Sequence, residues 1–195
     1  AVRAASDRIP VITGIITDST QGSVERGKAV ADLGIAALQV TPVHYLFRPT
    51  DEAMVTHFRT LTEETGLPVM IYNVVPWTYL SPGLLDRILT EVDGVIGVKQ
   101  SAGDMKLLAD LLVTSGSKGR IMTAVDALLY PSFALGAHGA IAAVLTAAPT
   151  LCVDVWDAVN AGDHMKAKAV HEKLLGIWNA INHDNLPANV KCAMR

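Results

Sequence analysis

The sequence has 195 residues, 50% of them hydrophobic, and a formal net charge of −3. A chain of this length and composition can bury a substantial core. The weakly acidic balance excludes the electrostatic footprint of a nucleic-acid-binding protein, and no basic run is present that would hold an anionic membrane.

Apolar segments rich in β-branched residues recur along the chain, and we predict that each is a strand: 11–16, 36–41, 68–73, 95–99, 120–124 and 139–144. Segments of helical character separate them. In the helix predicted after the second strand, Thr50 or Asp51 can cap the start and Gly66 can end it. The next predicted helix has Ser81 as its cap and Pro82 at its first position.

Strands spaced in this way, with helices between them, are typical of βαβ units and predict parallel pairing. We expect one domain, in which residues 1–148 are barrel units and residues 149–195 are a helical region packed on the barrel. A closed (βα)8 barrel needs about 250 residues. The sequence therefore predicts a partial TIM barrel in which strands three to eight are represented, shortened at both ends. An open, doubly wound sheet is the alternative fold.

Two residues whose side chains could take part in a reaction lie at the ends of neighbouring predicted strands. Tyr72 ends "VMIY" and Lys99 ends "VIGVK". The carboxyl ends of parallel strands share one edge of a barrel, so both side chains can reach the same small ligand. A desolvated lysine amine can attack a carbonyl, and a tyrosine hydroxyl can carry protons for it. The alternatives are a lysine that reaches solvent and a tyrosine that belongs to the core.

The segments around these two residues resemble a known family. "YNVVPWTYLSP" is similar to that family's "YNVP…TG…LSP" segment, and "VIGVKQSAGD" is similar to its "VGIKEASGD" segment. The family is the Schiff-base aldolases and lyases that include dihydrodipicolinate synthase and N-acetylneuraminate lyase. The resemblance extends over nearly the whole chain, from "RIPVITGIITDST" through "LQVTPVHYLFRPTDEA" to "GAHGAIAAVLTAAP".

The resemblance implies an enzyme that acts on pyruvate or another 2-oxo acid. Lys99 would form the imine and Tyr72 would donate and accept protons. Ile141 matches the position whose backbone carbonyl lies beside bound pyruvate, and Thr41 matches a substrate-binding position. The imine is itself the electron sink, so no cofactor is expected. Family membership further implies a homotetramer or homodimer.

The sequence departs from the family pattern at several places. The "GTTGE"-type loop that holds the pyruvate carboxylate belongs to the second barrel strand, and no "TT" pair occurs here. Trp77 stands where the synthase has an arginine for the carboxylate of its aldehyde, which favours a bulkier or less charged second substrate; Trp77 as loop packing is the alternative. His44 or Tyr45 stands where the family places a relay tyrosine, and His44 bonded to backbone is the simpler interpretation. Val125 replaces a commonly acidic residue.

Other site types find little support. His164 and His171 lie seven residues apart on a predicted helix with no further ligand at suitable spacing, so we expect solvated histidines and no metal site. Cys152 and Cys192 match no metal or redox spacing, and the N-terminus lacks the apolar stretch of a signal peptide. A soluble, cytoplasmic protein is therefore expected, with neither a nucleic acid nor a membrane as partner. A non-catalytic 2-oxo-acid-binding barrel, or an inactive fragment, is the alternative to the lyase.

Overall fold

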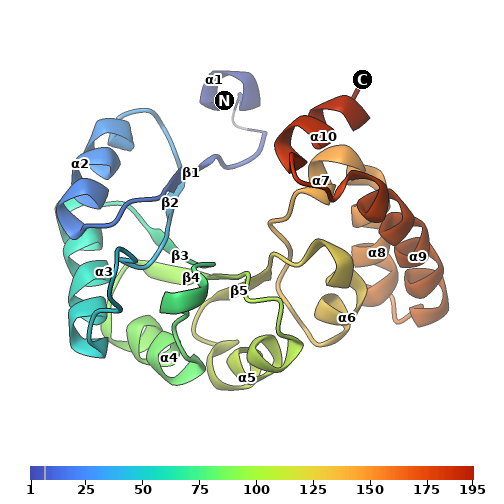
Figure 1. Cartoon of the computed structure of the whole chain (residues 1–195). Helices are drawn as coiled ribbons and strands as arrows, with labels where there is room; N and C mark the ends of the chain where they lie inside the picture. Colours follow the sequence, from blue (N-terminus) through green and yellow to red (C-terminus); the bar gives the residue numbers. More distant parts are fainter. Residues whose placement is uncertain (7) are drawn as a thin grey trace. The chain divides into compact units, whose positions relative to one another are not determined.

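Five parallel strands form one sheet in chain order in the computed structural model, which describes residues 1–6 and 8–195 (Figure 1). They are β1 (Ile12–Ile15), β2 (Ala37–Val40), β3 (Val69–Asn73), β4 (Val95–Gln100) and β5 (Arg120–Thr123). The chain divides into two compact units, Ala1–Ile121 and Met122–Arg195. Among the described residues, every helix is too short or too polar to cross a bilayer.

Helices alternate with the strands in the first unit. They are α1 (Val2–Ala5), α2 (Thr20–Ala31), α3 (Asp51–Thr65), α4 (Pro82–Glu91) and α5 (Met105–Ser115), with the 3-10 turn η1 (Pro76–Thr78) after β3. Side-chain caps set their starts: Thr50 accepts a hydrogen bond from the backbone of α3, and Ser81 does so for α4. Gly66 ends α3 in the left-handed conformation at φ 65°, as its place in the sequence predicted.

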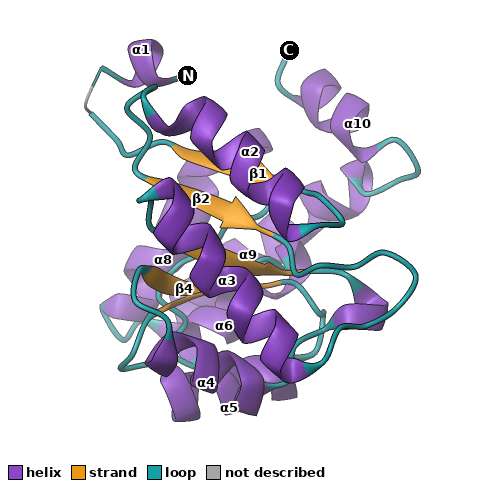
Figure 2. Cartoon of the chain, turned by 90° about the vertical axis from the view of Figure 1, so that its left-hand side faces the viewer, coloured by secondary structure: helices purple, strands orange, loops and turns teal. Residues whose placement is uncertain are grey.

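One face of the sheet carries the core of the first unit. In Figures 1 and 2 the helices α2 to α4 lie over this face. Val40, Ile71 and Val98 point into it from three successive strands and are fully buried. Because side chains alternate along a strand, the neighbours of these residues face the opposite side of the sheet.

Gly97 allows β4 to approach β5 closely. A Cβ atom at this position would lie 2.1 Å from the backbone oxygen of Arg120, so any side chain there would push the two strands apart.

The second unit is helical from Asp126 onward. It contains η2 (Asp126–Leu128), α6 (Leu129–Ala134), α7 (Val144–Ala147), α8 (Pro149–Asn160), α9 (His164–Ile181) and α10 (Leu186–Ala193). Leu129, Val155 and Leu174 are fully buried in its core.

The sixth predicted strand, 139–144, differs from the prediction. Only an isolated parallel bridge between Thr123 and Ala140 forms there. Asp126 accepts a hydrogen bond from the Val144 backbone nitrogen at 2.6 Å, and α7 begins at that residue. The last residue of the predicted strand is therefore the first residue of a helix, and its backbone N–H is bonded to a side chain and not to a neighbouring strand.

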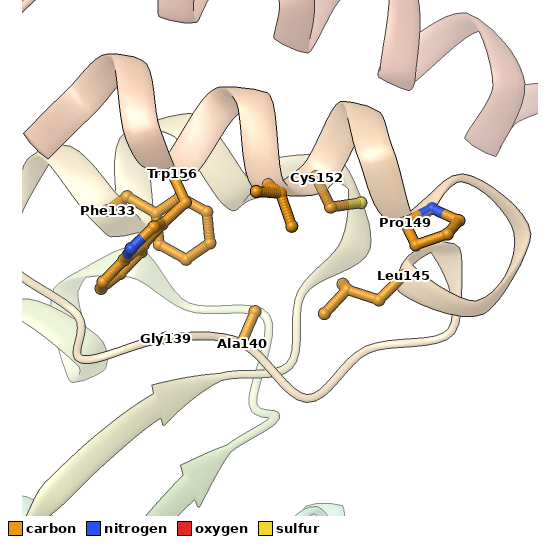
Figure 3. A pocket seen from close by; sticks show the side chains of 8 residues that line it. Phe133, Gly139, Ala140, Leu145, Pro149, Cys152 and Trp156 are labelled. Carbon is orange, nitrogen blue, oxygen red and sulfur yellow. The ribbon is translucent and has the colours of Figure 1, made fainter. Parts of the chain in front are cut away.

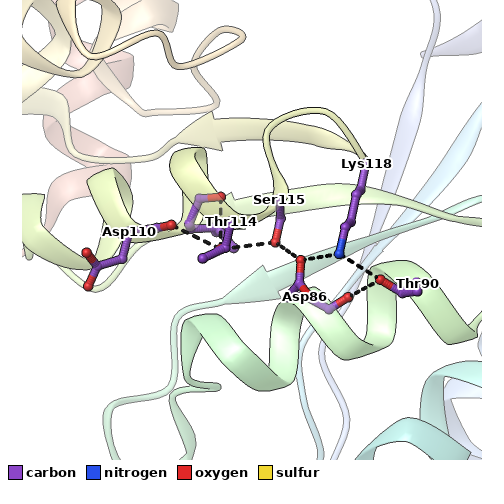
Figure 4. A network of polar contacts seen from close by, with 7 residues as sticks. Asp86, Thr90, Asp110, Thr114, Ser115 and Lys118 are labelled. Atoms are coloured by element: carbon purple, nitrogen blue, oxygen red, sulfur yellow. Dashed lines mark hydrogen bonds and ion pairs between the residues drawn. The ribbon is translucent and has the colours of Figure 1, made fainter.

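A polar cluster joins α4 to the end of α5 (Figure 4). Asp86 Oδ1 accepts hydrogen bonds from Ser115 Oγ at 2.8 Å and from Lys118 Nζ at 2.7 Å, and Lys118 also donates to Thr90. Ser115 is fully buried. These bonds lower the pKa of Asp86 below its usual range, and the bond from Lys118 has the larger effect.

We expect Asp86→Asn to lower the free energy of unfolding by about 1 kcal/mol at pH 7, because it removes the charge that Lys118 pairs with. The pKa of Asp86 is lower in the folded than in the unfolded state, so the stabilisation is present above pH ~4 and is lost as the pH falls through the folded pKa. Urea unfolding of both proteins between pH 7 and pH 3 measures the difference.

Asp110→Asn is the matched control, because it removes only the exposed pair between Lys106 and Asp110. Its expected effect is below about 0.5 kcal/mol. An Asp86→Asn protein that is as stable as the control at pH 7 would contradict this account of the cluster.

Candidate functional site

Tyr72 and Lys99 form a cross-strand pair. The register of β3 and β4 places Tyr72 beside Lys99, and the lysine Nζ lies 3.8 Å from the centroid of the tyrosine ring. This is cation–π geometry, and Lys99 is only 9% exposed. Both residues lie on the face of the sheet away from the helices, since Ile71 and Val98 take the other face. The prediction that these two strand ends bring a lysine and a tyrosine together is confirmed.

Thr41 lies on the same face of the sheet, directly after the neighbouring strand β2. Val40 pairs with Ile71, so the next residue of the β2 chain comes beside Tyr72. Its backbone nitrogen donates to the Ile15 oxygen at 3.3 Å, which continues the sheet through this position. The Thr41 hydroxyl is buried and makes no hydrogen bond within the described part of the chain. It is therefore available to a polar ligand.

A second cross-strand pair follows one residue later on the same two strands, and its side chains point to the opposite face of the sheet. Asn73 pairs with Gln100, and its Nδ2 donates to the Gln100 Oε1 at 3.3 Å. Asn73 also donates to the Leu80 oxygen and accepts from the Leu80 nitrogen, at 3.2 and 2.9 Å. These bonds fix the turn that follows β3. The sequence analysis missed this pair, although polar residues directly after Tyr72 and Lys99 were a visible signal.

Trp77 and His44 meet beyond the ends of β2 and β3. The indole nitrogen of Trp77 donates to the backbone oxygens of His44 and Tyr45, at 2.9 and 3.2 Å. The His44 Nδ1 is 2.9 Å from the Pro42 oxygen, so the imidazole is bonded to its own loop. This geometry agrees with a backbone-bonded histidine, and a proton-transfer role for His44 stays a prediction.

Ile141 belongs to the second compact unit. Its backbone nitrogen donates to the Thr123 oxygen at 2.9 Å, and the Thr123 nitrogen donates to the Gly139 oxygen at 3.0 Å. These two bonds fix the segment beside the end of β5. The role of Ile141 beside a substrate stays a prediction.

The second unit also holds an apolar pocket of about 270 Å³ (Figure 3). The rings of Phe133 and Trp156 meet edge to face at its wall, with centroids 5.0 Å apart. Its one ionisable group is Cys152. Burial raises the pKa of that thiol to about 11, so it is protonated at neutral pH and a poor nucleophile. The pocket offers apolar volume without the groups that a reaction needs.

The described residues contain no cluster of histidine, cysteine and carboxylate side chains able to hold a metal ion. His164 is exposed, as predicted. The prediction of a solvated histidine is wrong for His171, which is half-buried because its helix α9 packs into the second unit. Burial lowers the pKa of this imidazole.

The parallel βα architecture and the polar side chains at the strand ends define the class of protein: a barrel protein with its candidate site at the carboxyl ends of the strands. The chain belongs to the dihydrodipicolinate synthetase family, whose sequence model matches residues 1–195.

Individual relatives agree with this assignment. The chain is 30% identical to the 4-hydroxy-tetrahydrodipicolinate synthase of Bradyrhizobium diazoefficiens, with 99% of this chain and 65% of the relative covered. It is 32% identical to the synthase of Maridesulfovibrio salexigens, with 99% and 66% covered. A chloride-inhibited dihydrodipicolinate synthase from Acinetobacter baumannii, solved with pyruvate, superposes with a TM-score of 0.90 at 29% identity, covering 98% of this chain and 66% of that one.

The chain thus spans about 65% of the length of these relatives. Its fold is part of the family's barrel, and the predicted partial TIM barrel is confirmed.

We expect Asn73→Ala to lower the free energy of unfolding by about 2–3 kcal/mol, because it leaves the buried N–H and C=O of Leu80 without partners. Asn160→Ala is the control, since the Asn160 amide donates to a backbone oxygen at an exposed position. Equal urea midpoints for the two variants would contradict the role given to Asn73.

Proposed function

We propose that this protein is a Schiff-base-forming lyase that acts on pyruvate or a related 2-oxo acid, with Lys99 as the nucleophile and Tyr72 as the proton carrier. The observation that carries the proposal is the in-register pair, with the Lys99 nitrogen 3.8 Å from the centroid of the Tyr72 ring. Membership of the dihydrodipicolinate synthetase family supports it. So does a relative at 29% identity that was solved with pyruvate.

The neutral Lys99 amine attacks C2 of the 2-oxo acid, and the resulting carbinolamine loses its oxygen as water to give a protonated imine. The imine draws electrons from C3, so a proton leaves C3 and an enamine forms. The enamine carbon attacks the carbonyl carbon of an aldehyde, a new C–C bond forms, and the aldehyde oxygen takes up a proton. Water then hydrolyses the imine and releases the product and the free amine. Cleavage runs the same steps in reverse.

Tyr72 suits the proton transfers because it shares a face of the sheet with Lys99 and stands beside it. General acid–base catalysis by a positioned side chain contributes roughly 10²–10⁴-fold to a rate. The buried Thr41 hydroxyl on the same face can bond an oxygen of the 2-oxo acid. The family resemblance further implies a role for the Ile141 backbone beside the substrate, and that role is part of the proposal. Assembly as a homodimer or homotetramer in the cytoplasm is part of the proposal.

Borohydride trapping tests the nucleophile. Borohydride reduces a protonated imine to a stable secondary amine, so incubation with pyruvate and borohydride should leave a covalent adduct on the peptide that contains Lys99. We expect that adduct in the wild type and none at this peptide in Lys99→Arg, whose guanidinium does not form the imine. Peptide mass spectrometry locates the adduct.

Lys106→Arg is the matched control, because it makes the same exchange at an exposed lysine. It should keep the wild-type yield at Lys99. A wild-type protein that binds pyruvate and forms no adduct would overturn the lyase proposal and leave a 2-oxo-acid-binding barrel.

A further inference from the structure

His57 is a histidine on the buried face of helix α3. Its side chain is 2% exposed, and it lies on the helix face that also carries the buried Met54, Phe58 and Leu61. The Phe58 ring meets the imidazole edge to face, with centroids 4.8 Å apart. An apolar side chain would pack here without the cost of burying two ring nitrogens. A histidine at this position therefore indicates hydrogen bonds that an apolar residue could not make.

One ring nitrogen of His57 contacts the start of α2. Nδ1 lies 2.9 Å from Thr20 Oγ1. Thr20 is the first residue of α2, which begins shortly after β1 ends at Ile15. The helices α2 and α3 lie side by side over the sheet (Figures 1 and 2). The contact therefore joins α3 to the turn that follows β1.

The other ring nitrogen of His57 faces the end of β2. Burial lowers the pKa of the imidazole to about 4, and a hydrogen bond to the Thr41 backbone opposes this shift. Because Thr20 occupies Nδ1, we assign the bond with Thr41 to Nε2. Nε2 makes no hydrogen bond of good geometry within the described residues, so the bond with Thr41 is a weak one.

The two contacts determine which nitrogen of His57 carries the proton. A backbone oxygen only accepts, so a bond between the Thr41 oxygen and Nε2 requires a proton on Nε2. A neutral imidazole has one N–H. Nδ1 is then the acceptor, and the Thr20 hydroxyl donates to it. His57 thus links the ends of β1 and β2 as a neutral ring with one donor and one acceptor.

Thr41 is held through its backbone and not through its hydroxyl. Its N–H donates to the Ile15 oxygen at 3.3 Å, and its C=O faces the His57 imidazole. The hydroxyl lies on the face of the sheet that carries Tyr72 and Lys99, and it makes no hydrogen bond within the described part of the chain. The backbone contacts therefore fix the residue and leave its hydroxyl to a ligand.

We propose that His57 is a positioning residue. Through the Thr20 hydroxyl and the Thr41 carbonyl it clamps the ends of β1 and β2 together, and so it directs the Thr41 hydroxyl toward an oxygen of the bound 2-oxo acid. The substrate part rests on the proposed lyase function. The clamp does not depend on that function.

NMR of the imidazole tests the clamp without a substrate. In nitrogen–proton correlation spectra of the whole protein at pH 7, the His57 ring should be neutral and should carry its proton on Nε2. A neutral ring with its proton on Nδ1 would overturn the clamp, because the Thr41 oxygen cannot accept from a nitrogen that has no hydrogen.

Amide hydrogen exchange measures what the clamp holds. His57→Leu removes both ring nitrogens and keeps an apolar side chain in place. It should accelerate exchange of the Thr41 amide about fivefold, the effect of losing one ordinary hydrogen bond. The Ser101 amide, which donates to the Asn73 oxygen at 3.1 Å, should keep its wild-type rate. Acceleration of both amides by the same factor would show that His57 only stabilises the fold, and would overturn the positioning role.

Two further variants control this experiment. His57→Gln keeps an N–H that can donate to the Thr41 carbonyl, so it should restore slow exchange of the Thr41 amide. His183→Leu makes the same exchange as His57→Leu at an exposed histidine of the other compact unit, and it should leave the Thr41 amide at its wild-type rate.

A double-mutant cycle tests whether His57 acts through the Thr41 hydroxyl. The quantity measured is the pyruvate concentration that gives half of the maximal borohydride adduct on Lys99. Thr41→Val removes the hydroxyl and should raise this concentration about tenfold. His57→Leu should raise it roughly threefold to tenfold alone and should have no further effect in the Thr41→Val protein. Effects that multiply in the double variant would overturn the action through Thr41.

The outcomes separate this proposal from the lyase proposal. If the wild type forms no adduct on Lys99, the lyase proposal fails and the substrate part fails with it, while exchange of the Thr41 amide still decides the clamp. If the adduct forms and depends on pyruvate equally in the wild type and in His57→Leu, the positioning role alone is overturned.

Discussion

The pairing register of β3 and β4 is the constraint on which the candidate site depends. In a sheet, a shift of one residue moves every side chain of a strand to the other face. The observed register brings Tyr72 beside Lys99 and Asn73 beside Gln100, so two polar pairs occupy opposite faces of the same two strands. The first pair faces away from the helices and can meet a ligand. The second faces the helices and fixes the turn that leads to Trp77.

Because the two faces of β3 and β4 carry different side chains, a largely apolar strand can accommodate a lysine. The helix-facing residues of β3 and β4, among them Ile71 and Val98, are fully buried and drive the sheet against its helices. The buried Lys99 ammonium would be costly without compensation. The face of the Tyr72 ring offers it a cation–π contact. This contact stabilises the charged form of Lys99, whereas the proposed chemistry uses the neutral amine, with Tyr72 as the proton carrier.

Much of the fold was predictable from local patterns. Hydrophobic periodicity and capping residues identified the five strands, both ends of α3 and the start of α4, because those signals arise within a few residues. The sixth strand was wrongly extended, since the competing hydrogen bond from Val144 goes to Asp126, eighteen residues earlier in the chain. The half-buried state of His171 was missed, although its helical spacing from the buried Ala167 and Leu174 places it on the packed face of α9.

The candidate site was predictable in part. Parallel topology alone brings Tyr72 and Lys99 to one edge, and the family motifs identify them. The bonds of Asn73 to Leu80 and of Trp77 to the loop 42–49 join residues whose relative positions depend on the conformation of two turns. A sequence carries no periodic signal for such bonds. The sequence left Trp77 open between a replaced substrate contact and loop packing; in the structure it links two loops, and its contact with a substrate stays a prediction.

Proton exchange at pyruvate tests the central claim most directly, because it reports the imine and the proton transfer together and needs no second substrate. In D₂O, the wild-type protein should replace the methyl protons of pyruvate with deuterium, as followed by NMR. Lys99→Arg should abolish this exchange, and Tyr72→Phe should slow it by roughly 10²–10⁴-fold. Exchange by Lys99→Arg at the wild-type rate, or none by the wild type above the buffer, would contradict the account.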